Sequence, residues 1–459
     1  MAVFHIKKRK YCKQNNFKNN KRNIQLTMKE KFIKSTIILI IGGLITKILG
    51  MLIRIITTRI IGVNGIGLYM LIMPTYTLFI TIATLSLPIA ISKLVSENTR
   101  NNKNIVLGII PVALIFNIII ITILILSSKL IANTLLQNNN LYYPIIAISI
   151  TLPFITISNI IRGYFFGKQK MIPHVTSNLF EQITRLIITI IITPHLLKYG
   201  MIATITGLIL YNIISELLSI IILILFIPKN VTIKKSDIKP NPTNIKDTLE
   251  ISIPTTAGRI ITSIGGFLEP IIITFVLIKI GYDTSHITKE YGIISGFIFP
   301  MVMLPQFLSG AVASALLPTI STLHSKKNYQ AIKRKLSQAI IFSLLIGIIF
   351  TIIFCIFPKQ SLNIMFNTTE GYKYLILASP IFLLTYIQGP IISTLQAINK
   401  AKIVMTSSLI GTILKTISLY LLLYLDINMY ALLIAILIQY LYITIYQYIK
   451  LKKLLNKNT

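Results

Sequence analysis

The stretch TIILIIGGLITKILGMLIRIITTRI, residues 36–60, decides the fold. About 20 predominantly apolar residues carry a helix across the hydrocarbon core of a bilayer. A spanning segment must also satisfy its own backbone polar groups, so a helix is expected here. The stretch nevertheless holds three basic residues, Lys47, Arg54 and Arg59, and no acidic one. It therefore predicts a membrane helix whose basic residues have a functional role.

The composition of the whole chain agrees with a membrane protein. Of its 459 residues, 54% are hydrophobic and only 12% are charged, whereas soluble domains carry about 25% charged residues. This excludes a soluble enzyme. The net charge of +33 lies in short runs between apolar stretches, which indicates membrane topology and not nucleic-acid binding. Two cysteines and five scattered histidines offer no metal-binding spacing, so neither a metal nor a cofactor is expected.

Twelve apolar stretches are long enough to span the membrane, which predicts an all-α integral membrane protein. They lie near residues 36–60, 66–92, 104–128, 141–161, 171–194, 200–227, 248–278, 291–322, 336–357, 374–397, 403–424 and 428–448. The seventh and eighth contain Pro254, Pro270, Pro300, Pro305 and Pro318, which are expected to kink them.

The orientation follows from the basic loops, because short loops rich in Lys and Arg stay cytoplasmic. The segments before the first span, after each even-numbered span and after the last hold 33 Lys and Arg residues, against six in the opposite set. Both termini are therefore predicted to be cytoplasmic.

The spans divide into two halves. The predicted parts are a basic segment at 1–34, six-helix bundles at 35–227 and 247–449, a cytoplasmic linker at 228–246 and a basic tail at 450–459. Residues 1–27 are interpreted as a disordered tail or a misassigned start, with a lipid-binding arm as the alternative.

The halves resemble each other, which indicates an internal repeat. The pattern of two glycines and a charge recurs at the same spacing: Gly43, Gly50 and Arg54 in the first span, and Gly258, Gly265 and Glu269 in the seventh. An even number of spans separates the copies, so the bundles have the same orientation. Such bundles place a central cavity and the substrate path at their interface.

Charges inside the spans are costly and mark function or pairing. Lys47 and Arg54 are two turns apart on one helix face, which favours the wall of a hydrated cavity; snorkelling, or pairing with an acid such as Glu269, is the alternative. Arg59, off that face, is expected to snorkel to the interface. Arg259 and Lys415 complete the candidate cavity cations.

The acidic residues of the spans have two interpretations. Glu181 and Arg185 have the i,i+4 spacing of a neutralising pair, while Glu216 and Glu269 are candidates for coupling to an unidentified ion. The cations outnumber the acids, so the cavity should be net positive and select anionic cargo. Candidate points of helix bending or gating are Gly43, Gly50, Pro74, Pro270 and Pro300.

Three stretches carry a resemblance to a known family. Residues 46–97, RGYFFGKQKMIPHVTSNLFEQITRLI at 162–187 and LQAINKAKI at 395–403 resemble the stage V sporulation protein B branch of the polysaccharide exporter and lipid flippase families. These lie within the multidrug/oligosaccharidyl-lipid/polysaccharide superfamily. The likeness extends over residues 29–449, and Lys47 and Arg59 match basic positions of the family's first helix.

The resemblance implies a transporter of the bacterial inner membrane that flips an undecaprenyl-pyrophosphate-linked glycan by alternating access. In the sporulation branch this is a peptidoglycan precursor for the spore cortex. Expected partners are this anionic lipid, membrane lipids and cell-wall or spore-cortex synthases. The polyprenyl tail would leave through a side gap between the first and eighth helices or their repeat mates.

Two features depart from the family. Relatives often have 14 helices, whereas this chain has 12 predicted spans. Residues 66–92 contain no charge, although related lipid II flippases carry cavity arginines there. This argues against lipid II as the cargo but not against another anionic lipid-linked glycan.

Three rival functions remain. A cation-coupled multidrug exporter would have acids in its first helix, and this first helix has none. A non-transporting scaffold would depend on its basic loops and not on its cavity charges. A glycosyltransferase would need grouped acids in an outer loop, where Asp283, Glu290 and Asp426 are isolated. Nothing in the chain indicates covalent catalysis.

Overall fold

The computed structural model describes residues 2–97, 101–227 and 234–457, with side chains from Ile38 onward except at 235, 236 and 457. The described residues form helices joined by short turns, with no strand among them. The side chains of the predicted basic segment 1–34 and residues 228–233 of the predicted linker lie outside this description.

The first half begins with a very long helix. Its elements are α1 (Ala2–Thr84), α2 (Leu87–Glu97), α3 (Asn102–Lys129), the π-helix η1 (Leu130–Leu135), the 3₁₀ turn η2 (Asn139–Leu141), α4 (Tyr142–Gly167), α5 (Met171–Leu196), the 3₁₀ turn η3 (Leu197–Tyr199), α6 (Met201–Leu210) and α7 (Asn212–Leu225).

The second half follows a short helix, α8 (Lys235–Ile238). Its elements are α9 (Pro242–Ile280), α10 (Thr284–Gly292), the π-helix η4 (Ile293–Ile298), α11 (Phe299–Met303), α12 (Gln306–Ser325), α13 (Tyr329–Ile356), α14 (Pro358–Phe366), α15 (Tyr372–Ala397), α16 (Ala401–Leu423) and α17 (Tyr430–Lys457).

Gly62 divides α1 into two arms. Its φ of 66° and ψ of −172° are the non-helical angles inside α1, and they lie in a region that glycine enters without steric cost. The Arg54 guanidinium before the turn contacts the Met70 sulfur after it, at 3.0 Å, so the arms run back along each other. The reversal lies between the spans predicted at 36–60 and 66–92, and a single glycine makes it.

The number of membrane crossings agrees with the sequence. Within the described residues, 11 helical segments are long and apolar enough to span a membrane, and the first runs from Ile38 to Glu97. At 1.5 Å per residue its 60 residues would extend about 90 Å, roughly three bilayer cores. Since Gly62 reverses this segment, it makes two crossings. The total is then the predicted twelve.

The seventh span is one helical segment, whereas the eighth is interrupted. Pro254 and Pro270 lie inside α9, which runs as one helix from Pro242 to Ile280. The eighth span begins earlier than predicted, at Thr284, and passes through the π-helix η4 before it breaks at Leu304–Pro305. The chain there is a series of short helices, and the break at Leu304–Pro305 agrees with the kink predicted at Pro305.

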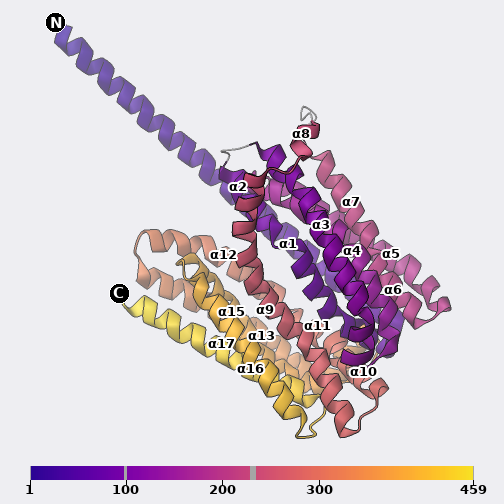
Figure 1. Ribbon diagram of the computed structural model, residues 1–459. Coiled ribbons are helices and arrows are strands. Elements are labelled where there is room, and N and C mark those ends of the chain that lie inside the picture. The colour runs from indigo at the N-terminus through magenta and orange to yellow at the C-terminus, as the bar shows by residue number, and fades with distance from the viewer. Residues whose placement is uncertain (1, 98–100, 228–233, 458–459) are drawn as a thin grey trace.

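The two halves converge at the end where α10 lies and diverge towards the end that holds both termini (Figure 1). One apolar core joins both halves at the α10 end and includes Ile66 and Ile294. At the other end the cores are separate: Ile91 belongs to a core of the first half, and Ile332 and Leu395 belong to one of the second. The large core shared by the two halves therefore lies at the α10 end, while at the other end Ile245 and Ile251 of α9 pack against the core of the first half.

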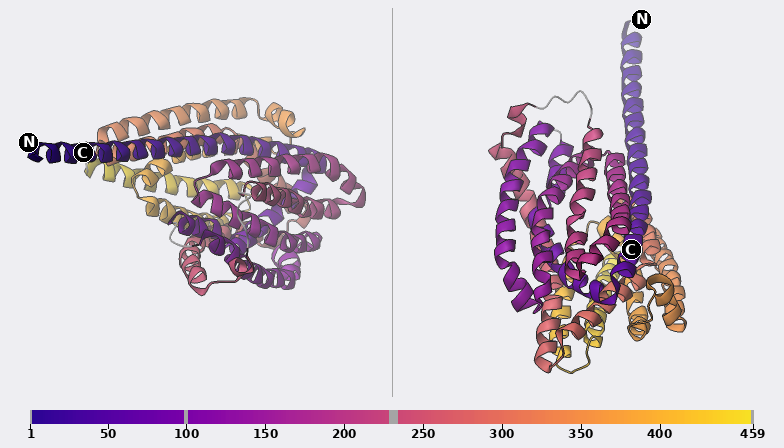
Figure 2. Two further views of the ribbon diagram at one scale, coloured as in Figure 1. Left: turned by 90° about the horizontal axis from the view of Figure 1, so that it is seen from above. Right: turned by 90° about the vertical axis from the view of Figure 1, so that its right-hand side faces the viewer.

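The long first arm of α1 runs along the molecule and projects beyond the other helices in both views of Figure 2. The start of α9 is tied to the first half by amide hydrogen bonds. The Asn104 side-chain nitrogen donates to the Lys239 carbonyl at 3.1 Å, and Asn244 donates to the Asn104 side-chain oxygen at 2.8 Å. The connection between halves is thus anchored on α3.

Candidate functional site

Lys47 lies in a groove between α1 and α12. The groove has a volume of about 430 Å³, and Lys47 is the only charged residue among those that line it within the described chain. Its other lining residues are small or apolar, among them Gly43, Phe307, Gly310 and Leu317. Lys47 is exposed and makes no hydrogen bond or ion pair with a described side chain. This groove lies where the side gap between the first and eighth spans was predicted.

Arg54, two turns further along α1, borders an inner cavity of about 260 Å³. This cavity lies between the two arms of α1 and helices α5, α6 and α7, and Tyr69, Tyr76, Tyr211 and Arg185 also line it. Its lining holds two guanidinium groups and three phenol hydroxyls. The cavity is thus rich in hydrogen-bond donors.

Arg54 itself has no carboxylate partner among the described residues. Its Nη2 donates to the Ser295 carbonyl, and its buried Nε has no hydrogen-bond partner in this structure. A buried donor left without an acceptor is costly, and an anion in the cavity would supply one.

Arg259 borders a third cavity, between the second arm of α1, α9 and α16. Its volume is about 430 Å³. Hydroxyl groups share the lining, among them Thr77, Thr81 and Ser408, and the Arg259 Nη1 donates to the Ser86 hydroxyl at 3.5 Å. No acidic residue lines this cavity or the other two in the described part of the chain.

Lys415 is paired, contrary to the prediction of a free cavity cation. Its Nζ lies 2.5 Å from the Glu269 carboxylate, and both side chains are nearly buried. The Tyr291 hydroxyl donates to the other Glu269 oxygen at 3.1 Å. Glu269 thus pairs with Lys415 and not with Arg54, because an interior charge is tolerated only beside its counter-ion.

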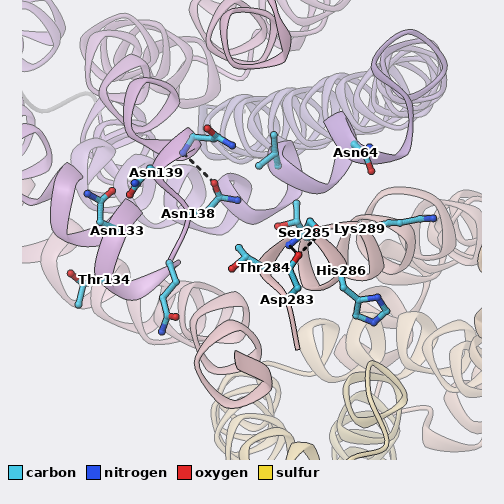
Figure 3. Close-up of a pocket in the computed structure, with 14 residues that line it drawn as sticks. Asn64, Asn133, Thr134, Asn138, Asn139, Asp283, Thr284, Ser285, His286 and Lys289 are labelled. Carbon is cyan, nitrogen blue, oxygen red and sulfur yellow. Dashed lines mark hydrogen bonds between the residues drawn. The ribbon is translucent and has the colours of Figure 1, made fainter. Parts of the chain in front are cut away.

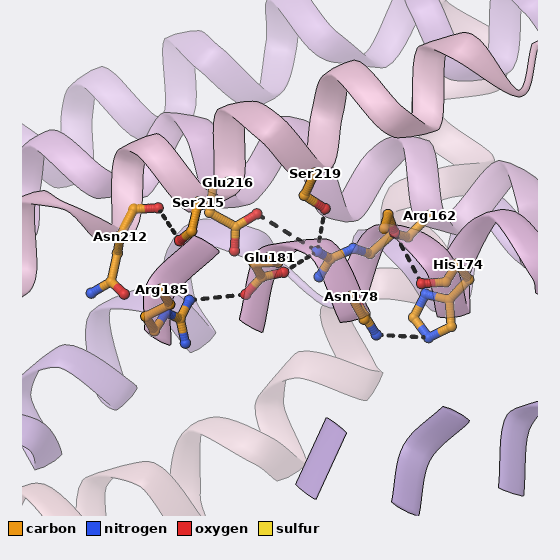
Figure 4. Close-up of polar contacts among 10 residues, drawn as sticks. Arg162, His174, Asn178, Glu181, Arg185, Asn212, Ser215, Glu216 and Ser219 are labelled. Carbon is orange, nitrogen blue, oxygen red and sulfur yellow. Dashed lines mark hydrogen bonds and ion pairs between the residues drawn. The ribbon is translucent and has the colours of Figure 1, made fainter. Parts of the chain in front are cut away.

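A second group of buried charges lies in the first half (Figure 4). Glu181 pairs with Arg185 at 2.9 Å, which confirms the i,i+4 prediction, and also with Arg162 at 2.6 Å. Arg162 further approaches Glu216 at 3.7 Å and donates to the Ser219 hydroxyl at 2.8 Å. Two arginines and two glutamates make this group neutral overall.

Arg162 is the residue that sequence reasoning missed. It was assigned to a cytoplasmic loop at 162–170, but α4 continues to Gly167 and buries the arginine. The signal available was the spacing to Gly167, since a helix commonly ends near a glycine. Hydropathy alone ended the span too early.

The remaining predicted residues have these positions. Gly43 and Gly50 are helical and border cavities, so the interruption of α1 is at Gly62 and not at either of them. Pro74 and Pro270 lie inside α1 and α9, and Pro300 lies at the start of α11. Arg59 is exposed and donates to the Met365 carbonyl of α14 at 2.8 Å, and its snorkelling to the interface stays a prediction.

A glycine contact seals the two halves at the α10 end. A methyl group added at Gly67 would lie 2.3 Å from the Thr288 carbonyl oxygen, and one added at Gly292 would lie 2.4 Å from the Gly67 Cα. Neither position has room for a side chain while the halves touch. Arg54 and its cavity lie just inside this seal, because Arg54 contacts Met70 and Ser295.

Comparisons with known proteins agree on a family. The chain matches the family described as polysaccharide biosynthesis protein over residues 32–324, and the MatE family over residues 258–421. It is 33% identical to stage V sporulation protein B of Bacillus subtilis (strain 168), over 84% of this chain and 77% of that protein. It is 25% identical to the lipid II flippase MurJ of the same organism, over 85% of this chain and 77% of that protein.

Solved structures share the fold. The inward-facing conformation of a multidrug resistance MATE family transporter of the MOP superfamily has a TM-score of 0.71, at 14% identity over 90% of this chain and 95% of that one. The outward-facing conformation of a MATE family transporter of the same superfamily has a TM-score of 0.57, at 14% identity over 94% of this chain and 96% of that one.

Proposed function

The chain belongs to the polysaccharide biosynthesis protein family, and from that premise we propose that it flips an undecaprenyl-pyrophosphate-linked glycan across the bacterial inner membrane. One observation carries the proposal: Lys47, Arg54 and Arg259 each border a cavity, and none of these cavities has a carboxylate in its described lining. Such cavities attract an anion and repel a cation. The names of the relatives, a sporulation protein and a lipid II flippase, support a lipid-linked glycan as the cargo class.

Each cavity has a role in this proposal. The diphosphate binds at Arg54, whose buried Nε needs an acceptor and whose neighbours Tyr69 and Tyr76 add hydroxyl donors. Charge-assisted hydrogen bonds to phosphate oxygens are among the strong ones. The polyprenyl tail lies in the apolar groove beside Lys47, between α1 and α12, and so stays in contact with lipid.

Transport requires the two halves to separate at the α10 end and to close at the opposite end. In this structure the halves are joined at the α10 end, where Gly67 meets Thr288 and Gly292. With both termini cytoplasmic, the structure is the inward-facing state, as its higher TM-score to the inward-facing transporter supports. Parting of the glycine contact opens the Arg54 cavity outward without any bond being made or broken.

The first rival, a multidrug exporter, shares the fold. Organic cations need carboxylates or a cavity free of cations, and the three cavities offer the reverse within the described residues. We therefore expect lipophilic cations not to be carried.

The proposal is tested by flipping of fluorescent undecaprenyl-pyrophosphate glycans in proteoliposomes. The test variant is Lys47→Gln/Arg54→Gln, which removes both charges and keeps polar side chains at the two positions. The control is Lys129→Gln, at an exposed lysine of α3 outside the three cavities. Loss of two charge-assisted contacts should slow flipping by roughly tenfold to a hundredfold, while the control retains its rate.

Equal rates in wild type, the double variant and protein-free liposomes would refute a flippase of this cargo. Transport of a cationic dye in place of the glycan lipid would favour the exporter. Thermal unfolding of each variant checks that the comparison is made on folded protein.

A further inference from the structure

A large polar cavity opens at the α10 end of the molecule, on the outward side of the glycine seal (Figure 3). Its volume is about 1070 Å³, and both halves contribute to it: α1 and the η1–η2 segment from the first, the start of α10 from the second. Of its 14 described lining residues, only Leu68 is apolar. Six carry side-chain amides: Asn64, Asn133, Gln137, Asn138, Asn139 and Asn140. We call this cavity the amide vestibule.

Most of these amides are available to a ligand. The Asn138 side-chain oxygen accepts from the Asn140 backbone nitrogen at 3.1 Å and so shapes the loop. The side chains of the other five make no hydrogen bond to a described residue. Each amide presents one acceptor and two donor hydrogens. Because each amide oxygen has two lone pairs, the vestibule offers hydrogen-bond donors and acceptors in equal number.

The vestibule has two charged side chains in its described lining, Asp283 and Lys289, and each has a partner in the structure. The Asp283 carboxylate accepts from the Ser285 backbone nitrogen at 2.9 Å and caps α10, and these hydrogen bonds with Ser285 lower the pKa of Asp283. Lys289 pairs with Glu370 at 3.1 Å. Asp283 and Lys289 have opposite signs, so the two charged side chains of the vestibule sum to zero, in contrast to the cationic cavities beside Lys47 and Arg54.

A ligand for such a cavity is neutral and carries many hydroxyl or amide groups. Sugar hydroxyls both donate and accept, as amides do, and a buried polar group of a ligand must find its partners. His286 adds a flat ring at the wall, stacked on Tyr282 at 5.4 Å between ring centroids. These features together fit an oligosaccharide better than a phosphate, a peptide cation or an apolar chain.

We propose that the amide vestibule binds the glycan of the cargo once it reaches the outer face. This inference rests on the proposed function, because it takes the cargo to be a glycan lipid. Asn64 and Leu68 lie on the same arm of α1 as Gly67, and Thr288 belongs to both the seal and the vestibule wall. Parting of the seal therefore joins the Arg54 cavity to the vestibule, and sugar binding there favours outward release.

The first test measures binding of soluble sugars that carry no diphosphate. N,N′-diacetylchitobiose and maltotriose are titrated into the full chain in detergent and followed by saturation-transfer NMR. The test variant is Asn64→Ala/Asn133→Ala/Asn139→Ala, and the control is Asn363→Ala, an exposed asparagine of α14 outside the vestibule. We expect the triple variant to bind at least one of these sugars about tenfold more weakly than wild type. The control should bind as wild type does, and inorganic pyrophosphate should bind all three proteins equally.

The second test separates the cargo's glycan from free glycan. Flipping is compared for undecaprenyl pyrophosphate with and without its sugar, and the triple variant should slow only the glycosylated lipid. No sugar binding by wild type, or equal binding by wild type and the triple variant, overturns the site. Weaker sugar binding with unchanged flipping overturns its role in transport. If the proposed function itself is wrong, the wild-type protein will not flip the glycan lipid at all, which distinguishes this result from failure of the vestibule site.

Discussion

The glycine seal makes the sharpest prediction about the transport cycle. Gly67→Ala adds a methyl group that would lie 2.3 Å from the oxygen and 2.9 Å from the carbon of the Thr288 carbonyl. Both are backbone atoms inside α10, so neither can move aside as a flexible side chain would. The substitution should therefore destabilise the sealed state, in which the halves touch at the α10 end.

The size of the effect follows from the geometry. Overpacking a well-packed contact by one methyl group costs about 1–3 kcal/mol. The helical preference of alanine over glycine, about 1 kcal/mol, acts in both states and cancels. The strain is present only while the halves touch, so the ratio of outward- to inward-facing molecules should rise by about 5- to 150-fold.

Double electron–electron resonance between two spin labels measures the ratio of outward- to inward-facing molecules. Labels at Lys198→Cys in the first half and Lys373→Cys in the second, both exposed, report the separation of the halves once Cys12 and Cys355 are replaced. Gly67→Ala should populate longer distances than wild type. The control is Gly266→Ala, where an added methyl group meets no heavy atom within 4 Å.

An unchanged distance distribution in folded Gly67→Ala would refute the seal. The same shift in Gly266→Ala would also refute it, because the cause would then be glycine replacement and not the contact. Gly292→Ala should act in the same direction as Gly67→Ala, since its methyl group would lie 2.4 Å from the Gly67 Cα.

Two further predictions concern the buried ion pairs. Arg162→Met should lower the free energy of unfolding by about 3–5 kcal/mol, because it leaves two buried carboxylates without their full counter-charge. Arg259→Met, at an exposed position without an ion pair, should change the free energy of unfolding little. Equal losses for the two variants in thermal or denaturant unfolding would contradict this prediction. Lys415→Met alone should lower the free energy of unfolding, and adding Glu269→Gln should restore most of that loss. If the loss in the double variant equals the sum of the losses in the two single variants, the pair is not coupled.

Local spacing predicted some of the site. Glu181 and Arg185 are four residues apart on one helix, and their ion pair follows from helix geometry alone. Lys47 and Arg54 share a helix face by the same geometry, although they border different cavities. Such predictions succeed because the interaction lies within a single helix.

Partners from distant helices could not be predicted. Lys415 and Glu269 are 146 residues apart, and Arg162 meets Glu216 from another helix. No spacing rule links residues on separate helices, because helix packing decides which faces meet. The reversal between the spans at 36–60 and 66–92 was predicted, but the residue that makes it, Gly62, was not, because a glycine permits a sharp turn but does not require one.

The sequence by itself determined the class of protein and its twelve crossings, because bilayer thickness sets the length of apolar segment that each crossing needs. Only the tertiary structure decided which charges stay unpaired. Lys415 finds Glu269 across two helices, while Arg54 meets carbonyl and sulfur acceptors and no described carboxylate. The physical reason is that the cost of an interior charge depends on what the neighbouring helices place beside it, and that neighbourhood exists only after the helices have packed.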